Sequence, residues 1–175
     1  MRGIAAAAEV TKSLIHHHFG SKENLWDEVK HHRFEEYAAV QRHILENAQP
    51  DAELLRRSVR TYFKFLQKHP GFARMVAWMH LEEAEDQPFD VAEGLMEKGI
   101  EAIRAAQEEG ELRGDLHPFF MLVTFLGMAD QWFQAKEHHC QWCADDSELR
   151  DDDAYLDAMV KIFFEGVLPR DDGRA

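Results

Sequence analysis

Apolar residues recur every three or four positions along almost the whole chain, which is the spacing of one face of an α-helix. No segment keeps the strict alternation of apolar and polar positions that is typical of a half-buried strand. The longest stripe predicts a helix over residues 22 to 47, whose apolar face is made by Leu25, Trp26, Val29, Tyr37, Ile44 and Leu45. The sequence therefore predicts an all-α fold.

Shorter stripes predict further helices in the middle of the chain. A stripe over residues 55 to 66 indicates one helix that ends at Pro70, and a second helix follows over residues 72 to 83. Pro88 fits the first turn of the next helix, where the missing N–H costs nothing, and that helix ends near Gly110.

Two segments near the C-terminus, residues 119 to 133 and 153 to 168, are apolar around more than half of a helix circumference. One protomer rarely covers such helices completely, so we expect them to form a four-helix bundle with a second copy across a two-fold axis. The predicted homodimer interface consists of Phe119, Leu122, Leu126, Phe133, Tyr155, Met159, Phe163 and Val167. A monomer with fully buried core helices is the alternative.

The first 25 residues have a different organisation, with short helices and turns. An alanine-rich run from Arg2 to Ala8 favours one short helix, and Thr11 offers an N-cap hydroxyl to a second, which Gly20 ends. Ser21 offers another N-cap to the long helix that follows. This order of helices and turns is typical of a helix-turn-helix head that binds nucleic acid.

In this head the chain resembles the TetR family of one-component transcriptional regulators, whose DNA-binding segment reads roughly I-A-x-x-A-G-V-S-K-G-x-L-Y-x-H-F-x-S-K-E-x-L. The ungapped match covers Ile4, Ala5, Ala8, Val10, Thr11, Lys12, Ile15, His18, Phe19, Ser21, Lys22, Glu23 and Leu25. Glu9 replaces the turn glycine, Ser13 replaces the second glycine, and His16 stands where the family usually has tyrosine. A side chain at a turn that favours a positive φ is strained, and the carboxylate of Glu9 would repel phosphates.

The resemblance and the residue types together suggest a set of DNA contacts, made to phosphates and to base edges. The candidate DNA-binding residues are Arg2, Thr11, Lys12, Ser13, His16, His17 and Lys22. The alternative is that they are ordinary polar faces of short helices. Members of the family carry a further helix before the position of Met1, which covers the equivalents of Ile4, Ile15 and Phe19. We therefore expect these three side chains to face water here, and the chain as given to bind DNA poorly.

Charge separates the head from the remainder of the chain. The net charge is -13, but residues 1 to 33 hold five lysine or arginine residues against four acidic ones. Five of the eleven histidines also lie there, so the charge of the head rises as the pH falls toward 6. A strongly acidic body repels phosphates, which orients the head and keeps non-specific DNA affinity low.

The segment from Gly99 to Phe133 also resembles the ligand-binding body of TetR proteins, with a G-E-L-R-x-D-x-D-P-like link in which His117 replaces the second aspartate. In that family the last two helices form the dimer interface. Aromatic and thioether side chains pack adaptably around apolar ligands, although each could equally be plain core. The candidate effector pocket consists of Phe63, Phe72, Met75, Trp78, Met79, Met121, Phe125, Met128 and Trp132.

Other classes of site and location have weaker support. The cluster His139, Cys140 and Cys143 could hold zinc or copper(I) if helical, but no second C-x-x-C exists, so no metal and no cofactor is predicted. No run of about 20 apolar residues or apolar signal-peptide core is present, so we expect a cytoplasmic protein that does not enter a membrane. No catalytic motif is organised, so we expect no enzyme activity.

The sequence thus predicts a helix-turn-helix DNA-binding region over residues 1 to 47, lacking the family's first helix, and an effector-binding and dimerisation domain over residues 48 to 175. The predicted function is a TetR-like repressor that binds double-stranded operator DNA as a dimer and is released by a small, largely apolar effector. The alternative is an effector-binding or interaction dimer that no longer binds DNA.

Overall fold

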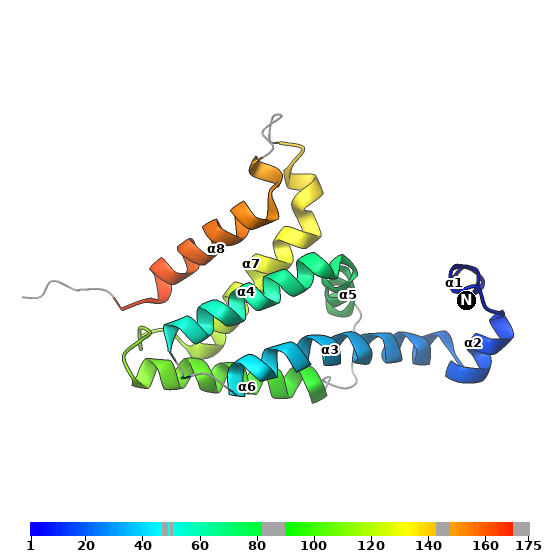
Figure 1. Cartoon of the computed structure of the whole chain (residues 1–175), viewed down its shortest axis with the longest axis horizontal. Helices are drawn as coiled ribbons and strands as arrows, with labels where there is room; N and C mark the ends of the chain where they lie inside the picture. Colours follow the sequence, from blue (N-terminus) through cyan, green and yellow to red (C-terminus); the bar gives the residue numbers. More distant parts are fainter. Residues whose placement is uncertain (47–48, 50, 82–89, 143–147, 170–175) are drawn as a thin grey trace, which may run out of the picture.

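The computed structural model describes residues 1–46, 49, 51–81, 90–142 and 148–169, and all regular secondary structure within these ranges is helical (Figure 1). The helices in chain order are α1 (Arg2–Ala7), α2 (Lys12–Phe19), α3 (Lys22–Glu46), α4 (Ala52–Lys68), α5 (Pro70–Leu81), α6 (Asp90–Glu108), α7 (Pro118–His139), the 3-10 turn η1 (Glu148–Arg150) and α8 (Asp152–Val167). The all-α prediction is confirmed. The helix α7 continues past the predicted end at residue 133, and Pro88 lies outside the described residues.

The N-terminal helices are delimited by the residues that the sequence indicated. The Thr11 hydroxyl accepts a hydrogen bond from the backbone N–H of Leu14 (3.1 Å), which caps α2. The Ser21 hydroxyl accepts one from the N–H of Asn24 (3.0 Å), which caps α3. Gly20 ends α2 with a φ of 72°, a conformation that glycine adopts without steric cost. Local capping interactions therefore set the ends of the helices in the head, independently of tertiary packing.

Figure 1 shows α1 and α2 at the free end of α3, away from the helices of the body. The helix α3 has 25 residues and is therefore about 37 Å long, since an α-helix rises about 1.5 Å per residue. Its C-terminal half packs against α4 and α6. One continuous helix thus belongs to both the head and the body.

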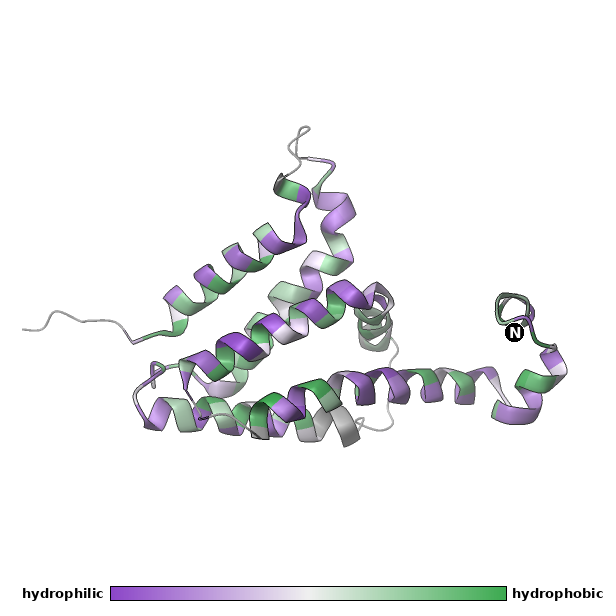
Figure 2. Cartoon of the chain, in the orientation of Figure 1, coloured by the Kyte–Doolittle hydropathy of each residue, from purple (hydrophilic) through white to green (hydrophobic). Residues whose placement is uncertain are grey.

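The body consists of α4 to α8 around the C-terminal half of α3. Its largest fully buried side chains are Val59, Phe63, Leu66, Leu112, Phe125, Leu156, Met159 and Phe164. Figure 2 shows hydrophobic and hydrophilic residues in alternating bands along these helices, as expected for amphipathic helices that bury one face. Within the described ranges no helix is both long and apolar enough to cross a membrane.

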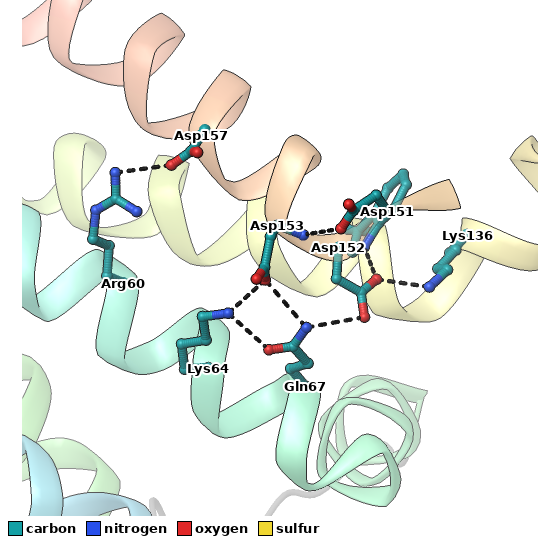
Figure 3. Close-up of polar contacts among 9 residues, drawn as sticks. Arg60, Lys64, Gln67, Lys136, Asp151, Asp152, Asp153 and Asp157 are labelled. Carbon is teal, nitrogen blue, oxygen red and sulfur yellow. Dashed lines mark hydrogen bonds and ion pairs between the residues drawn. The ribbon is translucent and has the colours of Figure 1, made fainter. Parts of the chain in front are cut away.

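A polar cluster fixes the start of α8 against α4 and α7 (Figure 3). One carboxylate oxygen of Asp152 accepts hydrogen bonds from the indole N–H of Trp132 (2.8 Å) and from the ammonium group of Lys136 (2.7 Å). On the other side Lys64 forms an ion pair with Asp153, and the Gln67 amide bridges both aspartates. The three helices are thereby held in one register.

Candidate functional site

The candidate DNA-binding residues all lie on the surface of the head. All seven are exposed to solvent, namely Arg2, Thr11, Lys12, Ser13, His16, His17 and Lys22. They come from α1, from α2 with its N-cap, and from the first residue of α3. The His16 ring is oriented because its Nδ1 lies 3.0 Å from the carbonyl oxygen of Gly20, in hydrogen-bonding contact. Polar and basic groups therefore gather on the short helix α2, which is the expected recognition helix.

The turn between α1 and α2 contains the strained residue that the sequence pointed to. Glu9 has a φ of 54°, and it is the only non-glycine residue with a positive φ among those described. The N–H of Val10 donates to the carbonyl of Ala5 (3.0 Å), which closes the end of α1 around this residue. Glycine would occupy this conformation without strain, so Glu9 makes the turn less stable.

The expected exposure of the head's apolar residues is only partly correct. Ile4 is 43% exposed, but Ile15 is 5% exposed and Phe19 is half-buried. The expectation for Ile15 is wrong because α2 contacts both α1 and α3, and these helices cover its side chain within the chain.

The body contains a cavity of about 350 Å³ that is partly open to solvent. This volume falls at the lower end of the roughly 300–1,000 Å³ that is typical of small-molecule sites. Residues of α3, α4, α5, α6 and α7 line it, and most of them are apolar. The wall contributed by α3 consists of Phe34, Tyr37, Gln41 and Leu45. The helix that carries the head is therefore also a wall of the cavity.

Two of the nine predicted pocket residues, Phe72 and Phe125, line this cavity. Four others, Phe63, Met75, Met121 and Trp132, are buried in the core but do not line the cavity, and Met79 and Met128 are half-buried beside that core. Trp78 is 59% exposed, so its prediction as a pocket residue is wrong. Apolar character alone did not distinguish lining residues from core residues, because both occupy the buried faces of the same helices.

Sequence reasoning missed the polar part of the lining. Gln41, Ser58, Tyr62 and Asp130 all face the cavity. The signal was present, because Ser58 lies three residues after Leu55 on the buried face of α4, and Gln41 lies four residues after Tyr37 on α3. A polar residue within an apolar helical stripe indicates a site rather than plain core.

On the polar side of the cavity, a hydrogen bond connects Tyr62 and Asp130. The Tyr62 hydroxyl donates to a carboxylate oxygen of Asp130 across 2.6 Å, which joins α4 to α7. Burial raises the pKa of the Tyr62 hydroxyl well above its ordinary value, and the charge of Asp130 raises that pKa further. The pKa of Tyr37 is raised by the same two causes in the same order. Both phenols therefore stay protonated and can donate hydrogen bonds.

Two further polar atoms of the lining have no hydrogen-bond partner in the described part of the chain, namely Gln41 Oε1 and Ser58 Oγ. Each side chain belongs to a residue that is only 4% exposed. Buried polar atoms in proteins are nearly always hydrogen-bonded, so two in one cavity call for an explanation.

The predicted dimer interface needs correction. Leu122, Met159, Phe163 and Val167 are each at most 6% exposed, and they pack in the core of their own chain. The broad apolar surface of α8 is buried against α4 and α7, so these residues do not present a free face to a partner. Leu122 and Leu126 line the cavity instead.

The remaining members of that predicted interface are more accessible. Phe133 and Tyr155 are half-buried, and Tyr155 stacks on Trp132 at 4.1 Å between ring centroids. Phe119 is 41% exposed. The most exposed large apolar residues of α7 and α8 are Phe120 (63%) and Ile162 (65%), which the sequence did not single out.

The histidine and cysteine cluster at the end of α7 has structural partners. Cys140 is buried, and its thiol lies 3.6 Å from the carbonyl oxygen of Leu149. The His139 ring stacks on Trp142. Cys143 lies outside the described residues, and among those that are described no group of three histidine, cysteine or acidic side chains is arranged to hold a metal.

Comparisons with known proteins find two family models that match separate ranges of the chain. The family model described as "Tetracyclin repressor-like, C-terminal domain" matches residues 55–161, and the model described as "Bacterial regulatory proteins, tetR family" matches residues 1–29. The solved structure of a candidate transcriptional regulator from Streptomyces coelicolor is similar, with a TM-score of 0.71 and 20% identity over 94% of this chain and 84% of that chain. At this identity the likeness concerns the fold. No curated protein gives a significant match.

Proposed function

Because the chain belongs to the TetR family of bacterial regulatory proteins, we propose that it is a repressor whose DNA binding is controlled by a small molecule in the body cavity. The head would bind operator DNA through α2, and the cavity would hold the effector. The observation that carries this proposal is that α3 both lines the cavity and bears the head.

The geometry of α3 supports coupling between the two sites. Gln41 lines the cavity, and Lys22 begins the helix 19 residues earlier, about 28 Å away along the axis. A tilt of about 5° at Gln41 would move the start of a rigid helix, about 28 Å away, by about 2.5 Å. A ligand that fits the cavity better in one tilt than in the other would shift the population of head positions.

Such a shift matters most for a dimer. Two heads of a symmetric dimer bind half-sites about 34 Å apart, so a small change at each head removes the match to successive major grooves. We propose that dimerisation uses the exposed apolar residues of α7 and α8, Phe119, Phe120 and Ile162. This surface replaces the buried residues that the sequence suggested.

DNA binding is tested directly with labelled DNA from upstream of the protein's own gene, by fluorescence anisotropy over a series of salt concentrations. Lys12→Ala and Lys22→Ala should each weaken binding and reduce the slope of log affinity against log salt by about one, because each lysine neutralises about one phosphate. Lys68→Ala, an exposed lysine in the last turn of α4, is the matched control and should change neither quantity.

Unchanged affinity and salt slope in both head variants would contradict the proposed contacts. Absence of any sequence-dependent binding by the unaltered chain would instead favour the alternative function, a ligand-binding or interaction dimer.

A further inference from the structure

The cavity combines an apolar wall with two polar atoms that have no hydrogen-bond partner among the described residues, Gln41 Oε1 and Ser58 Oγ. The two residues come from neighbouring helices, α3 and α4, which pack against each other. A buried acceptor without a partner destabilises the free protein, and a ligand group that donates a hydrogen bond to it removes that cost. The binding of a donor is therefore favoured at this position.

The charged residues of the lining indicate which net charge the ligand can carry. Asp51 and Asp130 are the charged residues among the described lining, which contains no lysine, arginine or histidine. One carboxylate oxygen of Asp51 accepts the N–H of Leu54 (2.7 Å), and one of Asp130 accepts the Tyr62 hydroxyl. An anionic ligand would meet the negative charges of Asp51 and Asp130, and no cationic side chain of the described lining would offset this repulsion.

The apolar part of the lining indicates that the rest of the ligand, apart from its polar group, is apolar. Leu45, Leu54, Leu95, Ile103 and Leu126 add aliphatic surface to the same lining. A ligand that fills this space gains from burying apolar groups, whereas its polar group has to lie near Gln41 and Ser58.

We propose that the effector is an uncharged or cationic amphiphile, with an apolar body and a hydroxyl or amino group that donates a hydrogen bond to Gln41 and pairs with Ser58. This inference rests on the proposed function, since it specifies the ligand of the same cavity. A hydroxyl group can both donate and accept, so it can satisfy both side chains. A carboxylate cannot donate to Gln41 Oε1, and it would also face Asp130.

Four probes with the same ten-carbon chain test this assignment on the full chain: decanol, decylamine, decyl methyl ether and decanoate. Binding is measured by calorimetry and by the shift of the melting temperature. Decanol and decylamine should bind, and decanol should bind about five- to tenfold more tightly than the ether, which accepts hydrogen bonds but cannot donate one. Decanoate should bind most weakly.

Two cavity variants connect this preference to the named residues. Gln41→Met and Ser58→Ala should each reduce the preference for decanol over the ether toward onefold, while the affinity for the ether stays unchanged. Gln131→Met, at an exposed position of α7 outside the lining, is the control and should keep the preference. The ligand-free cavity variants should melt at the same temperature or higher, because each removes an unpartnered polar atom, so a loss of preference is not a loss of fold.

Equal binding of decanol and the ether, tighter binding of decanoate, or an unchanged preference in both cavity variants would overturn the assignment. The last result would mean that water alone occupies the polar pair. If none of the four probes binds, the inference fails together with the effector part of the proposed function, and DNA binding by the unliganded head remains a separate result.

Discussion

At the scale of single residues, Glu9 connects local strain in the head to DNA binding. Its φ of 54° places a residue with a Cβ atom in a region that suits glycine, and its carboxylate is exposed beside α2. Strain and charge both act against a stable, phosphate-binding head. They can be separated because one substitution removes both effects and another removes only the charge.

We expect Glu9→Gly to stabilise the head by about 1 kcal/mol, since glycine avoids the steric cost of the left-handed conformation. Amide hydrogen exchange in α1 and α2 should slow, and affinity for upstream DNA should rise. In the control Glu9→Ala the charge is lost but the strain remains, so DNA affinity should rise without slower exchange. Equal exchange rates in the unaltered chain and the glycine variant would show that the turn is not strained.

At the scale of elements, the start of α8 depends on Asp152. Burial by itself raises the pKa of this carboxyl, but hydrogen bonds from Lys136 and Trp132 lower it by more, so the pKa lies below its ordinary value of 3.8. A carboxyl whose pKa is lower in the folded state stabilises the fold above its unfolded pKa. That contribution is lost as the pH falls through the folded pKa.

Asp152→Asn should therefore lower the melting temperature at pH 7, because Lys136 and Trp132 lose a charged acceptor. The difference from the unaltered protein should begin to shrink below about pH 4, where the carboxyl of the unfolded chain becomes protonated, and it should be lost as the pH falls through the lower pKa of the folded state. Asp157→Asn is the control: this residue pairs with Arg60 at an exposed site and should change stability little. A difference that stays constant from pH 7 to pH 3 would contradict the assigned role.

The sequence was most informative where local chemistry decides structure. Thr11, Ser21 and Gly20 delimit the head through hydrogen bonds and backbone conformation that depend on neighbours a few residues away. The position of Glu9 at a positive φ followed from the family's turn glycine. These features were predictable because they do not require knowledge of tertiary packing.

The sequence was less informative about whether a buried residue packs within its own chain or against a partner. Met159 and Phe163 were predicted to face a partner, but helices of the same chain cover them. Helical spacing shows that a residue is buried without showing which surface buries it. Most of the cavity lining was missed for the same reason, and its best marker was a polar residue such as Ser58 on a buried face.

At the scale of the whole molecule, the proposed dimer depends on apolar residues that the body leaves exposed. Substituting aspartate for Phe125 or Phe163 would test folding, because these residues are 2% and 4% exposed within one chain. Ile162 is 65% exposed, so Ile162→Asp should dissociate the dimer and leave the helical content of the protomer unchanged. Analytical ultracentrifugation measures the state of association.

Val40→Asp serves as the control for that experiment. Val40 is an exposed aliphatic residue of α3, 48% accessible, that lies outside the proposed interface. Its variant should remain dimeric. A dimer that survives Ile162→Asp at the lowest measurable concentrations would place the interface elsewhere.

Through α3, the cavity of the body and the DNA-binding head are proposed to be coupled. If a ligand changes DNA affinity by some factor, DNA must change the ligand's affinity by the same factor, because the coupling free energy is reciprocal. Coupling of this kind typically amounts to about 5- to 150-fold. The two affinities can be measured independently on the same protein.

The most direct measurement is the affinity of the chain for its upstream DNA, with and without saturating decanol. Calorimetry of decanol binding to the free and to the DNA-bound protein completes the cycle. We predict that decanol weakens DNA binding by at least about fivefold and that DNA weakens decanol binding by the same factor. DNA affinity that stays unchanged while decanol occupies the cavity would contradict the proposed coupling through α3.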